Sequence, residues 1–124
     1  MAKRKKKPSI KSLIKTMDEQ FKEKIFTRDI KEFGSKCSLC LADGVRLIWC
    51  HLISARKYSV RWAHRNVYAQ CNSCNIRHEH YPEYYTAWWV RRHGEEAYQE
   101  LVRESMVPAN YKRKDYEQMI GAIK

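Results

Sequence analysis

Two Cys-x-x-Cys pairs, Cys37/Cys40 and Cys71/Cys74, constrain this chain more than any other feature of its sequence. One such pair presents two thiolates to a single ion, and two pairs supply the four sulfurs of a closed tetrahedral zinc site. Residues 41–70 separate the pairs, a longer gap than in a simple zinc ribbon, which leaves room for a hairpin. We therefore predict a structural zinc ion bound by Cys37, Cys40, Cys71 and Cys74. A redox role is disfavoured, because the βαβ context of thioredoxin-like motifs is missing.

The length of 124 residues suits one compact domain plus tails, with a core small enough to benefit from a metal or from dimerisation. No apolar run approaches the roughly 20 residues of a membrane span. Residues 1–8 are basic and lack the apolar stretch of a secretory signal. We therefore expect a cytoplasmic protein, in which disulfides are not expected.

Charge favours a polyanionic partner. The chain has 25 Lys and Arg against 14 Asp and Glu, a net charge of +11 and a pI near 9.6. Ribosomal, nucleoid and membrane-surface proteins share such a balance, but charge and aromatic content together favour nucleic acid. Residues 1–12 form a basic arm, expected to be disordered and to contact a nucleic-acid backbone. The alternative for this arm is a solubilising tail.

Hydrophobic periodicity and turn residues predict a mixed α+β chain. Apolar residues at helical spacing predict a helix over residues 13–33, ended by Gly34. Asp43-Gly44 is a turn signal before a short apolar strand that ends at Cys50-His51, and a loop over 52–65 leads to a second strand at 66–68. The remaining helices are expected after Cys74 and at 83–92, 95–106 and 113–123.

Polar residues typical of phosphodiester chemistry lie within and just after the zinc motif. His51 ends the first strand, Asn66 begins the second, and Asn75 directly follows Cys74. Hydrolysis of a phosphodiester needs a base to activate water and a divalent ion to stabilise the phosphate. A neutral imidazole suits the first task, and flanking oxygen or nitrogen ligands suit the second.

The run "CSLC … WCHLISARKYSVRWAHRNVYAQCNSCN" resembles the HNH, or ββα-metal, endonucleases. More narrowly it is similar to the lambdoid phage NinG (Rap) recombination nucleases. That family has a His at a strand end, an Arg-rich loop, then "RW…N(V)…AQC..CN" and later "Y…G…L". It also resembles the endonuclease VII type, in which zinc knuckles bracket the active site. The likeness covers roughly residues 16–105 and is most specific at its centre.

The resemblance implies a role for each candidate residue. His51 would be the general base, Asn66 would hold the hairpin loop that aims it, and Asn75 would be an oxygen ligand of a catalytic Mg²⁺ or Mn²⁺ ion. His78 or Glu79 would reach the same ion from the start of a helix. Cys50 stands where this family usually has an Asp or His ligand. Because a thiolate suits Mg²⁺ poorly, either the ion is Mn²⁺ or Zn²⁺, or water replaces Cys50.

Basic side chains around this motif are expected to hold DNA phosphates. They are Arg46, Arg56, Lys57, Arg61, Arg65 and Arg77, with Arg91 and Arg92 further along. The aromatic run Tyr81, Tyr84, Tyr85, Trp88 and Trp89 is expected to be hydrophobic core. The alternatives for this run are a dimer interface or a stacking platform at a DNA branch. His64 and His93 are expected at the surface.

The sequence thus predicts a small zinc-bound ββα-metal core with flanking helices. The boundaries are a basic arm at 1–12, a nuclease domain at 13–110 with its zinc-bracketed core at 37–80, and a tail or short helix at 111–124. The expected function is metal-dependent cleavage of DNA. The NinG resemblance implies branched recombination intermediates, such as Holliday junctions or flaps, in a phage setting, and a homodimer would suit a symmetric junction. The alternatives are a non-catalytic zinc-finger DNA-binding protein and a nicking nuclease of packaging or homing.

Overall fold

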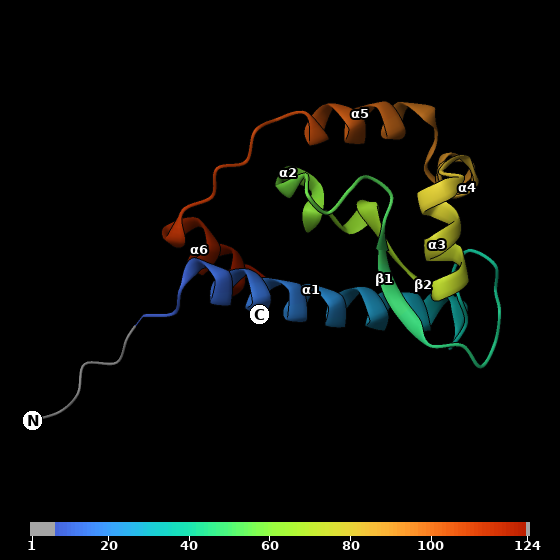
Figure 1. Ribbon diagram of the computed structural model, residues 1–124, viewed down its shortest axis with the longest axis horizontal. Coiled ribbons are helices and arrows are strands. Elements are labelled where there is room, and N and C mark those ends of the chain that lie inside the picture. The colour runs from blue at the N-terminus through green and yellow to red at the C-terminus, as the bar shows by residue number, and fades with distance from the viewer. Residues whose placement is uncertain (1–6, 124) are drawn as a thin grey trace, which may run out of the picture.

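The computed structural model describes residues 7–123 and consists of helices around a two-stranded sheet (Figure 1). Most of the predicted basic arm, residues 1–6, lies outside the described residues, as does Lys124. The last residues of that arm, 10–12, already belong to the first helix, so the arm ends earlier than predicted. In chain order the elements are α1 (Ile10–Phe33), β1 (Leu47–His51), α2 (Tyr58–Arg61), η1 (His64–Asn66), β2 (Val67–Cys71), α3 (Asn72–His80), α4 (Glu83–His93), α5 (Glu95–Ser105) and α6 (Arg113–Ile123).

Helix α1 is the longest element, and its ends follow from local chemistry. The hydroxyl of Ser9 accepts a hydrogen bond from the Ser12 N–H at 3.1 Å and so caps the first turn. Gly34 has a φ of 72°, a left-handed conformation that favours glycine, and its N–H donates to the Ile30 carbonyl. Its buried side chains recur every fourth residue and form one continuous stripe: Leu13, Met17, Phe21, Ile25 and Asp29.

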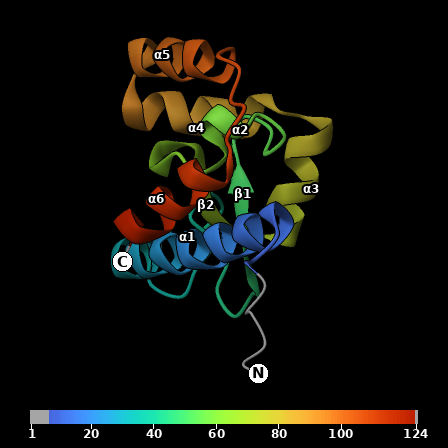
Figure 2. The same ribbon diagram turned by 90° about the vertical axis from the view of Figure 1, so that its left-hand side faces the viewer.

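Helix α6 lies alongside the first half of α1 in both views of the ribbon (Figures 1 and 2). Tyr116 packs with Leu13 and Met17 in a small cluster, which the side chain of Trp62 borders. The predicted helix at 113–123 therefore forms, and it belongs to the same packed unit as α1.

The sheet is an antiparallel pair in which His51 lies opposite Val67 and Cys50 lies opposite Tyr68. Because side chains alternate between the faces of a strand, His51, Trp49 and Val67 share one face. Val67 packs there with Phe21 and Ile25, so this face meets α1. Cys50 and Tyr68 lie on the other face.

That second face carries the largest core cluster. Cys50 and Tyr68 pack there with Tyr85 and Trp89 of α4 and with Leu101 of α5. In Figure 1 the sheet therefore lies between α1 below and α5 above, with α3 and α4 beside it. Each face of this small sheet is covered by at least one helix, which is how so short a hairpin avoids exposing apolar surface.

The edge of β2 that faces away from β1 is satisfied by side chains rather than by a third strand. The carboxylate of Asp29 accepts a hydrogen bond from the Ala69 N–H at 2.7 Å, and Arg28 donates to the Val67 carbonyl at 2.6 Å. The hydroxyl of Ser38 donates to the Ala69 carbonyl at 2.7 Å. Arg28 and Asp29 are themselves paired at 2.8 Å. These contacts tie α1 and the first cysteine pair to β2 and remove an unpaired strand edge.

Most predicted elements form, and the differences are local. The stretch 52–65, predicted as a loop, contains α2 and most of η1. Strand β2 extends through Cys71 beyond the predicted residues 66–68, and α3 begins at Asn72, before Cys74 rather than after it. The mixed α+β class is confirmed. None of the helices in residues 7–123 has the length and apolar character needed to cross a membrane.

Replacing Asp29 should destabilise the fold, because Asp29→Ala leaves the Ala69 N–H without an acceptor and removes the partner of Arg28. We expect a loss of about 2–4 kcal/mol in the free energy of unfolding. Urea denaturation of the zinc-loaded protein measures it. Glu23→Ala, an exposed position on the same helix, is the control and should change the value by less than about 0.5 kcal/mol. Equal values for the two variants would contradict the role given to Asp29.

Candidate metal centre and catalytic site

The sulfur atoms of Cys37, Cys40, Cys71 and Cys74 all lie within 4.8 Å of one another. The Cys37 and Cys74 sulfurs are 3.7 Å apart, and those of Cys40 and Cys71 are 3.8 Å apart. A disulfide would need about 2.05 Å. Four sulfurs at about 2.3 Å from a shared ion, in a tetrahedron, would be about 3.8 Å from each other. The four thiols are thus arranged to hold a structural metal ion such as zinc.

Local backbone geometry presents each pair of thiols. In the first pair, the Leu41 N–H donates to the Cys37 carbonyl at 2.8 Å, and Leu41 has a φ of 61°, which closes a tight turn. The Cys40 N–H points at the Cys37 sulfur at 3.5 Å. In the second pair, Cys71 ends β2 and Cys74 lies in the first turn of α3. The cluster therefore joins the segment before β1 to the junction of β2 and α3.

The thiols differ in how readily they lose a proton. Burial raises the pKa of Cys37, but the N–H groups of Cys40, Cys71 and Leu39 outweigh it and bring the pKa down to about 7. The pKa of Cys74 is raised, first by burial and then by the neighbouring thiols. Sulfurs this close repel one another as thiolates, so a shared cation is what would allow all of them to ionise.

His51, the predicted general base, lies at the end of β1 with its imidazole half-buried. Its Nε2 lies 2.9 Å from the carbonyl oxygen of Arg61. A carbonyl only accepts, so Nε2 must carry the proton and Nδ1 is left as the basic nitrogen. Burial lowers the pKa of His51 below its ordinary value of 6.5, and the nearby Arg61 charge adds to this while its carbonyl opposes it. The imidazole is therefore neutral at pH 7.

A carboxylate on α1 fixes the segment that holds His51. Asp18 accepts two hydrogen bonds from the Arg61 guanidinium, at 3.0 and 2.7 Å, and one from the indole N–H of Trp62 at 2.9 Å. Because Arg61 is also the residue whose carbonyl meets His51, Asp18 positions the His51 side chain through Arg61. The Trp49 ring, 4.7 Å away and nearly perpendicular, packs against the imidazole.

Asn66 holds the other end of the same segment. Its side chain is fully buried, accepts from the Ile53 N–H at 2.8 Å and donates to the carbonyls of Ile53 and Val60 at 2.9 and 3.0 Å. The side chain thus closes the loop between the strands. This is the loop-holding contact expected of Asn66.

The side chains predicted to bind a catalytic ion do not form one cluster of His, Cys, Asp or Glu ligands in the described residues. Cys50 is buried on the sheet face away from His51, its sulfur lies 3.7 Å from the Ile48 carbonyl, and burial raises its pKa to about 12. On α3, Asn75 is half-buried and Glu79 is exposed. Among His, Cys, Asp and Glu side chains in residues 7–123, the four cysteines are the only group of three or more close enough to share an ion.

His78 is packed rather than open. Its Nε2 lies 2.9 Å from the Leu52 carbonyl and its ring contacts Tyr85 edge-on. Its Nδ1 is buried without a hydrogen-bond partner among the described residues. This places α3 against the residue that follows His51 in the chain.

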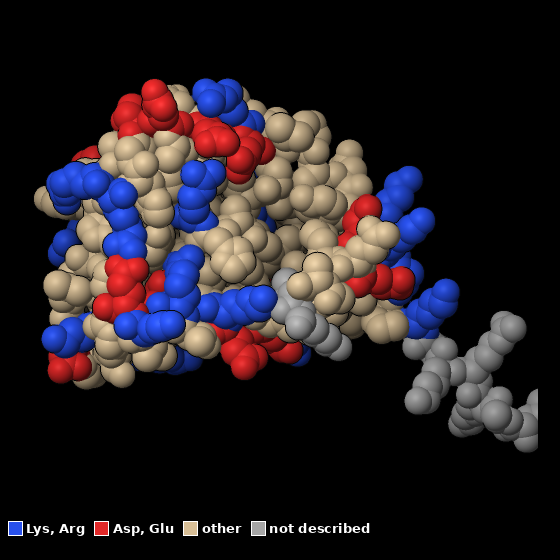
Figure 3. All heavy atoms as spheres, turned by 180° about the vertical axis from the view of Figure 1, so that it is seen from behind, with Lys and Arg blue, Asp and Glu red and all other residues tan. Residues whose placement is uncertain are grey.

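The predicted DNA-binding side chains divide into free and paired groups. Arg46, Arg56, Lys57 and Arg77 are exposed. Arg61 is engaged with Asp18, and Arg65 lies 3.7 Å from Glu100. On the face seen from behind, Lys and Arg lie at several places across the middle, the lower part and the right edge, and acidic side chains lie along the top, over α5, and in smaller groups among the basic ones (Figure 3). On this face the positive charge is therefore not confined to one stripe.

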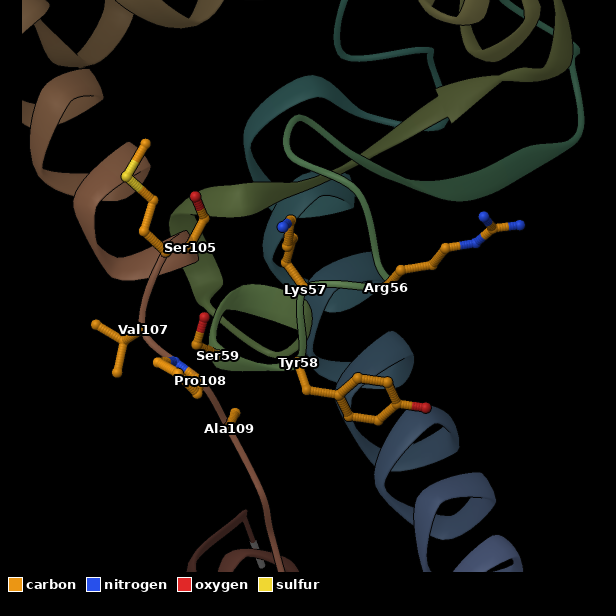
Figure 4. A pocket seen from close by; sticks show the side chains of 9 residues that line it. Arg56, Lys57, Tyr58, Ser59, Ser105, Val107, Pro108 and Ala109 are labelled. Carbon is orange, nitrogen blue, oxygen red and sulfur yellow. The ribbon is translucent and has the colours of Figure 1, made fainter.

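Arg56 and Lys57 border a hollow of about 300 Å³ between the loop after β1 and the segment that follows α5 (Figure 4). Its two serine hydroxyls are already used, because Ser59 donates to the Glu104 carbonyl and Ser105 to the Val102 carbonyl. The Arg56 side chain extends away from Ser105 and Val107. The polar groups that this hollow offers a ligand are therefore mainly the cations at its rim, Arg56 and Lys57.

The aromatic run is core only in part. Tyr85 and Trp89 are fully buried and Trp88 packs against the same cluster, but Tyr81 and Tyr84 are more than half exposed. Among the histidines, His64 is exposed as predicted, whereas His93 is half-buried and lies 2.7 Å from the Tyr68 hydroxyl. The prediction of a surface position for His93 is wrong, because it lies at the end of α4 beside β2.

The sequence analysis did not identify two carboxylates that organise the sheet and the loop beside His51. Asp18 and Asp29 both lie on the helix at one side of the sheet, and their partners are far away in the chain. The only sequence feature that could have identified them is their position on the predicted helix. Asp29 lies within its apolar stripe and Asp18 lies beside it. Asp29 continues the four-residue spacing of the buried positions, a place where a charge needs a partner.

Comparisons with models of known protein families, with curated proteins and with solved structures find no match to this chain.

Metal content tests the cysteine cluster. We expect one tightly held zinc ion per chain in the purified protein, and loss of both zinc and fold in Cys37→Ser and Cys71→Ser. Elemental analysis and circular dichroism measure the two effects. Cys50→Ala is the matched control, since Cys50 lies outside the cluster, and should keep its zinc. Folded protein without metal, or zinc loss in the Cys50 variant, would contradict the assignment.

Proposed function

We propose that this protein is a DNA endonuclease of the HNH, or ββα-metal, type, with His51 as its general base. The observation that carries the proposal is the contact between His51 Nε2 and the Arg61 carbonyl. A half-buried imidazole that is neutral at pH 7, fixed in one tautomer and held at the end of a strand against a braced loop has the properties of a general base. His78 also has Nε2 on a backbone carbonyl, but its Nδ1 is buried without a partner, whereas the Nδ1 of His51 is not among the buried unpartnered atoms of residues 7–123.

The chemistry assigned to His51 is proton transfer from water. Nδ1 takes the proton as the water oxygen forms a bond to phosphorus, and the bond from phosphorus to the leaving sugar oxygen breaks. As Nδ1 becomes protonated the imidazole gains charge. The Arg61 carbonyl, which accepts from Nε2, then stabilises the cation, while burial limits its lifetime. Asp18 and Asn66 keep the carbonyl and the loop in place during the step.

The predicted ligands of the catalytic divalent ion do not form a preorganised metal site. Cys50 is a buried neutral thiol, and His78 already uses Nε2 on a backbone carbonyl. Asn75 and Glu79 remain as oxygen donors one helical turn apart on α3. Dependence of cleavage on Mg²⁺ or Mn²⁺ therefore stays a prediction.

The metal of the cysteine cluster is proposed to be zinc with a structural role. Four thiolates close its coordination shell, so it has no open position for water or substrate. In this proposal β1, β2 and α3 form the ββα core, and the zinc ion holds the base of that core together. DNA is the proposed substrate because the chain is strongly cationic and Arg46, Arg56, Lys57 and Arg77 are free to meet phosphates. A branched DNA structure and a homodimer remain parts of the proposal that rest on the family resemblance.

The direct test is the His51→Ala variant. We expect it to lose cleavage by at least about 10²-fold, since general-base catalysis typically contributes 10²–10⁴-fold. DNA binding should change little, because affinity comes from many Lys and Arg contacts. A gel assay with junction, flap, duplex and single-stranded DNA, with Mg²⁺, Mn²⁺ or EDTA, measures cleavage, and fluorescence anisotropy measures binding.

His80→Ala is the matched control, since His80 is an exposed histidine at the end of α3. It should cleave like the wild type. A non-catalytic zinc-finger protein would instead bind DNA without cutting any of these substrates. Cleavage by His51→Ala near the wild-type rate would exclude His51 as the base.

A further inference from the structure

A hollow of about 390 Å³ lies between α1 and the strand that ends in His51. Its lining combines aromatic, apolar and basic side chains: Lys22, Phe26, Arg46, Leu47, Ile48 and Trp49. Lys22 and Arg46 are cations, and no acidic residue lines the hollow. Trp49 is on the same face of the sheet as His51, two residues earlier in the strand. Trp49 therefore lines the hollow and lies on the same face of the sheet as the proposed base.

Trp49 connects this hollow to the base. Its ring contacts the His51 ring at 4.7 Å and the Phe21 ring at 6.1 Å, and it is half-buried. The indole N–H groups of Trp62 and Trp89 donate to Asp18 and to the Arg65 carbonyl. Within residues 7–123 no such acceptor is found for Trp49, nor is its indole nitrogen among the buried unpartnered atoms.

Two cations lie against the Trp49 ring, and only one of them is held by an ion pair. The Arg61 guanidinium is 5.6 Å from the ring centre and is held by Asp18. The Lys22 ammonium is 5.5 Å away, and no carboxylate in the described part of the chain forms an ion pair with it. Lys22 can therefore move from the ring to a phosphate, which frees ring surface for a flat group.

We infer that this hollow binds an unpaired nucleotide of the strand that is cut, with its base against Trp49 and its phosphates near Lys22 and Arg46. Single-stranded nucleic acid is recognised by this combination, aromatic rings for the bases and cations for the backbone. A paired base cannot offer its face to Trp49, because that face is stacked within the duplex. The inference rests on the proposed function, which it deepens by naming unpaired DNA as the substrate class.

The experiment is a titration of the zinc-loaded protein with a ten-nucleotide oligothymidine, followed by NMR of the tryptophan indole N–H signals. No Mg²⁺ or Mn²⁺ is added, and a gel confirms that the oligonucleotide stays intact. We expect the Trp49 signal, identified by its absence in Trp49→Phe, to shift most, and those of Trp62 and Trp89 to shift little. A Trp49 signal that does not move would overturn the inference.

Affinities measured by fluorescence anisotropy give the second readout. Trp49→Ala should bind the oligothymidine roughly ten- to a hundredfold more weakly, the usual contribution of one aromatic–base stack, and Trp49→Phe should keep most of the affinity. Lys22→Glu leaves the aromatic packing in place. It removes one phosphate contact and adds a negative charge, so it should weaken oligothymidine binding at least as much as the loss of a single Lys–phosphate contact. The matched control is Lys114→Ala, which removes an exposed charge on α6. Equal affinities of Lys22→Glu and Lys114→Ala for the oligothymidine, or a Trp49 signal that shifts as far with a blunt duplex as with the oligothymidine, would contradict the inference.

These measurements separate the two proposals. If no DNA is cleaved but Trp49 still responds to the oligothymidine, the endonuclease proposal fails and the nucleotide site stands. If DNA is cleaved while Trp49 and Lys22 have no effect on binding, the nucleotide site fails and the endonuclease proposal stands.

Discussion

The cluster of four cysteine sulfurs is the constraint on which the rest of the structure depends. It joins the segment before β1 to the junction of β2 and α3. The start of β1 and the end of β2 are therefore held together at one end of the hairpin. A two-stranded sheet is marginal by itself in water. Here the sulfur cluster closes one end of the hairpin, and the side chains of Arg28, Asp29 and Ser38 satisfy the outer edge of β2. The loop at the other end of the hairpin is then free to carry chemistry.

That loop is ordered by polar contacts that converge from both of its sides. Asp18 reaches it from α1 through Arg61, and Asn66 reaches it from the end of η1, just before β2. The carbonyl that meets His51 belongs to Arg61, so the residue that anchors the loop also selects the tautomer of the base. A flexible loop would leave the imidazole free to rotate, and its basic nitrogen would then have no defined direction.

The sequence predicted the parts of this arrangement that depend on neighbours in the chain. Cysteine spacing predicted the sulfur cluster, turn residues and periodicity predicted most elements, and His51 and Asn66 were named before their contacts were seen. Contacts between distant segments were not accessible in this way. Asp18 meets Arg61 and Asp29 meets Ala69 only because α1 crosses the sheet. The contact of His78 with the Leu52 carbonyl likewise joins segments far apart in the chain. The opposite facing of Cys50 and His51, by contrast, follows from the alternation of side chains along a strand.

The central claim is that His51 is a neutral imidazole, protonated at Nε2, that takes a proton from water. Heteronuclear NMR of the histidine ring nitrogens over a pH series tests it most directly, together with the pH dependence of single-turnover cleavage. Burial lowers the pKa of His51, so the neutral form should persist below pH 6.5 and the cleavage rate should fall only as the pH drops through that lowered value. We expect the Nε2–H tautomer, and one shared midpoint below pH 6.5 for the titration of His51 and for the cleavage rate. A proton on Nδ1, or a cleavage rate that does not follow the titration of His51, would contradict it.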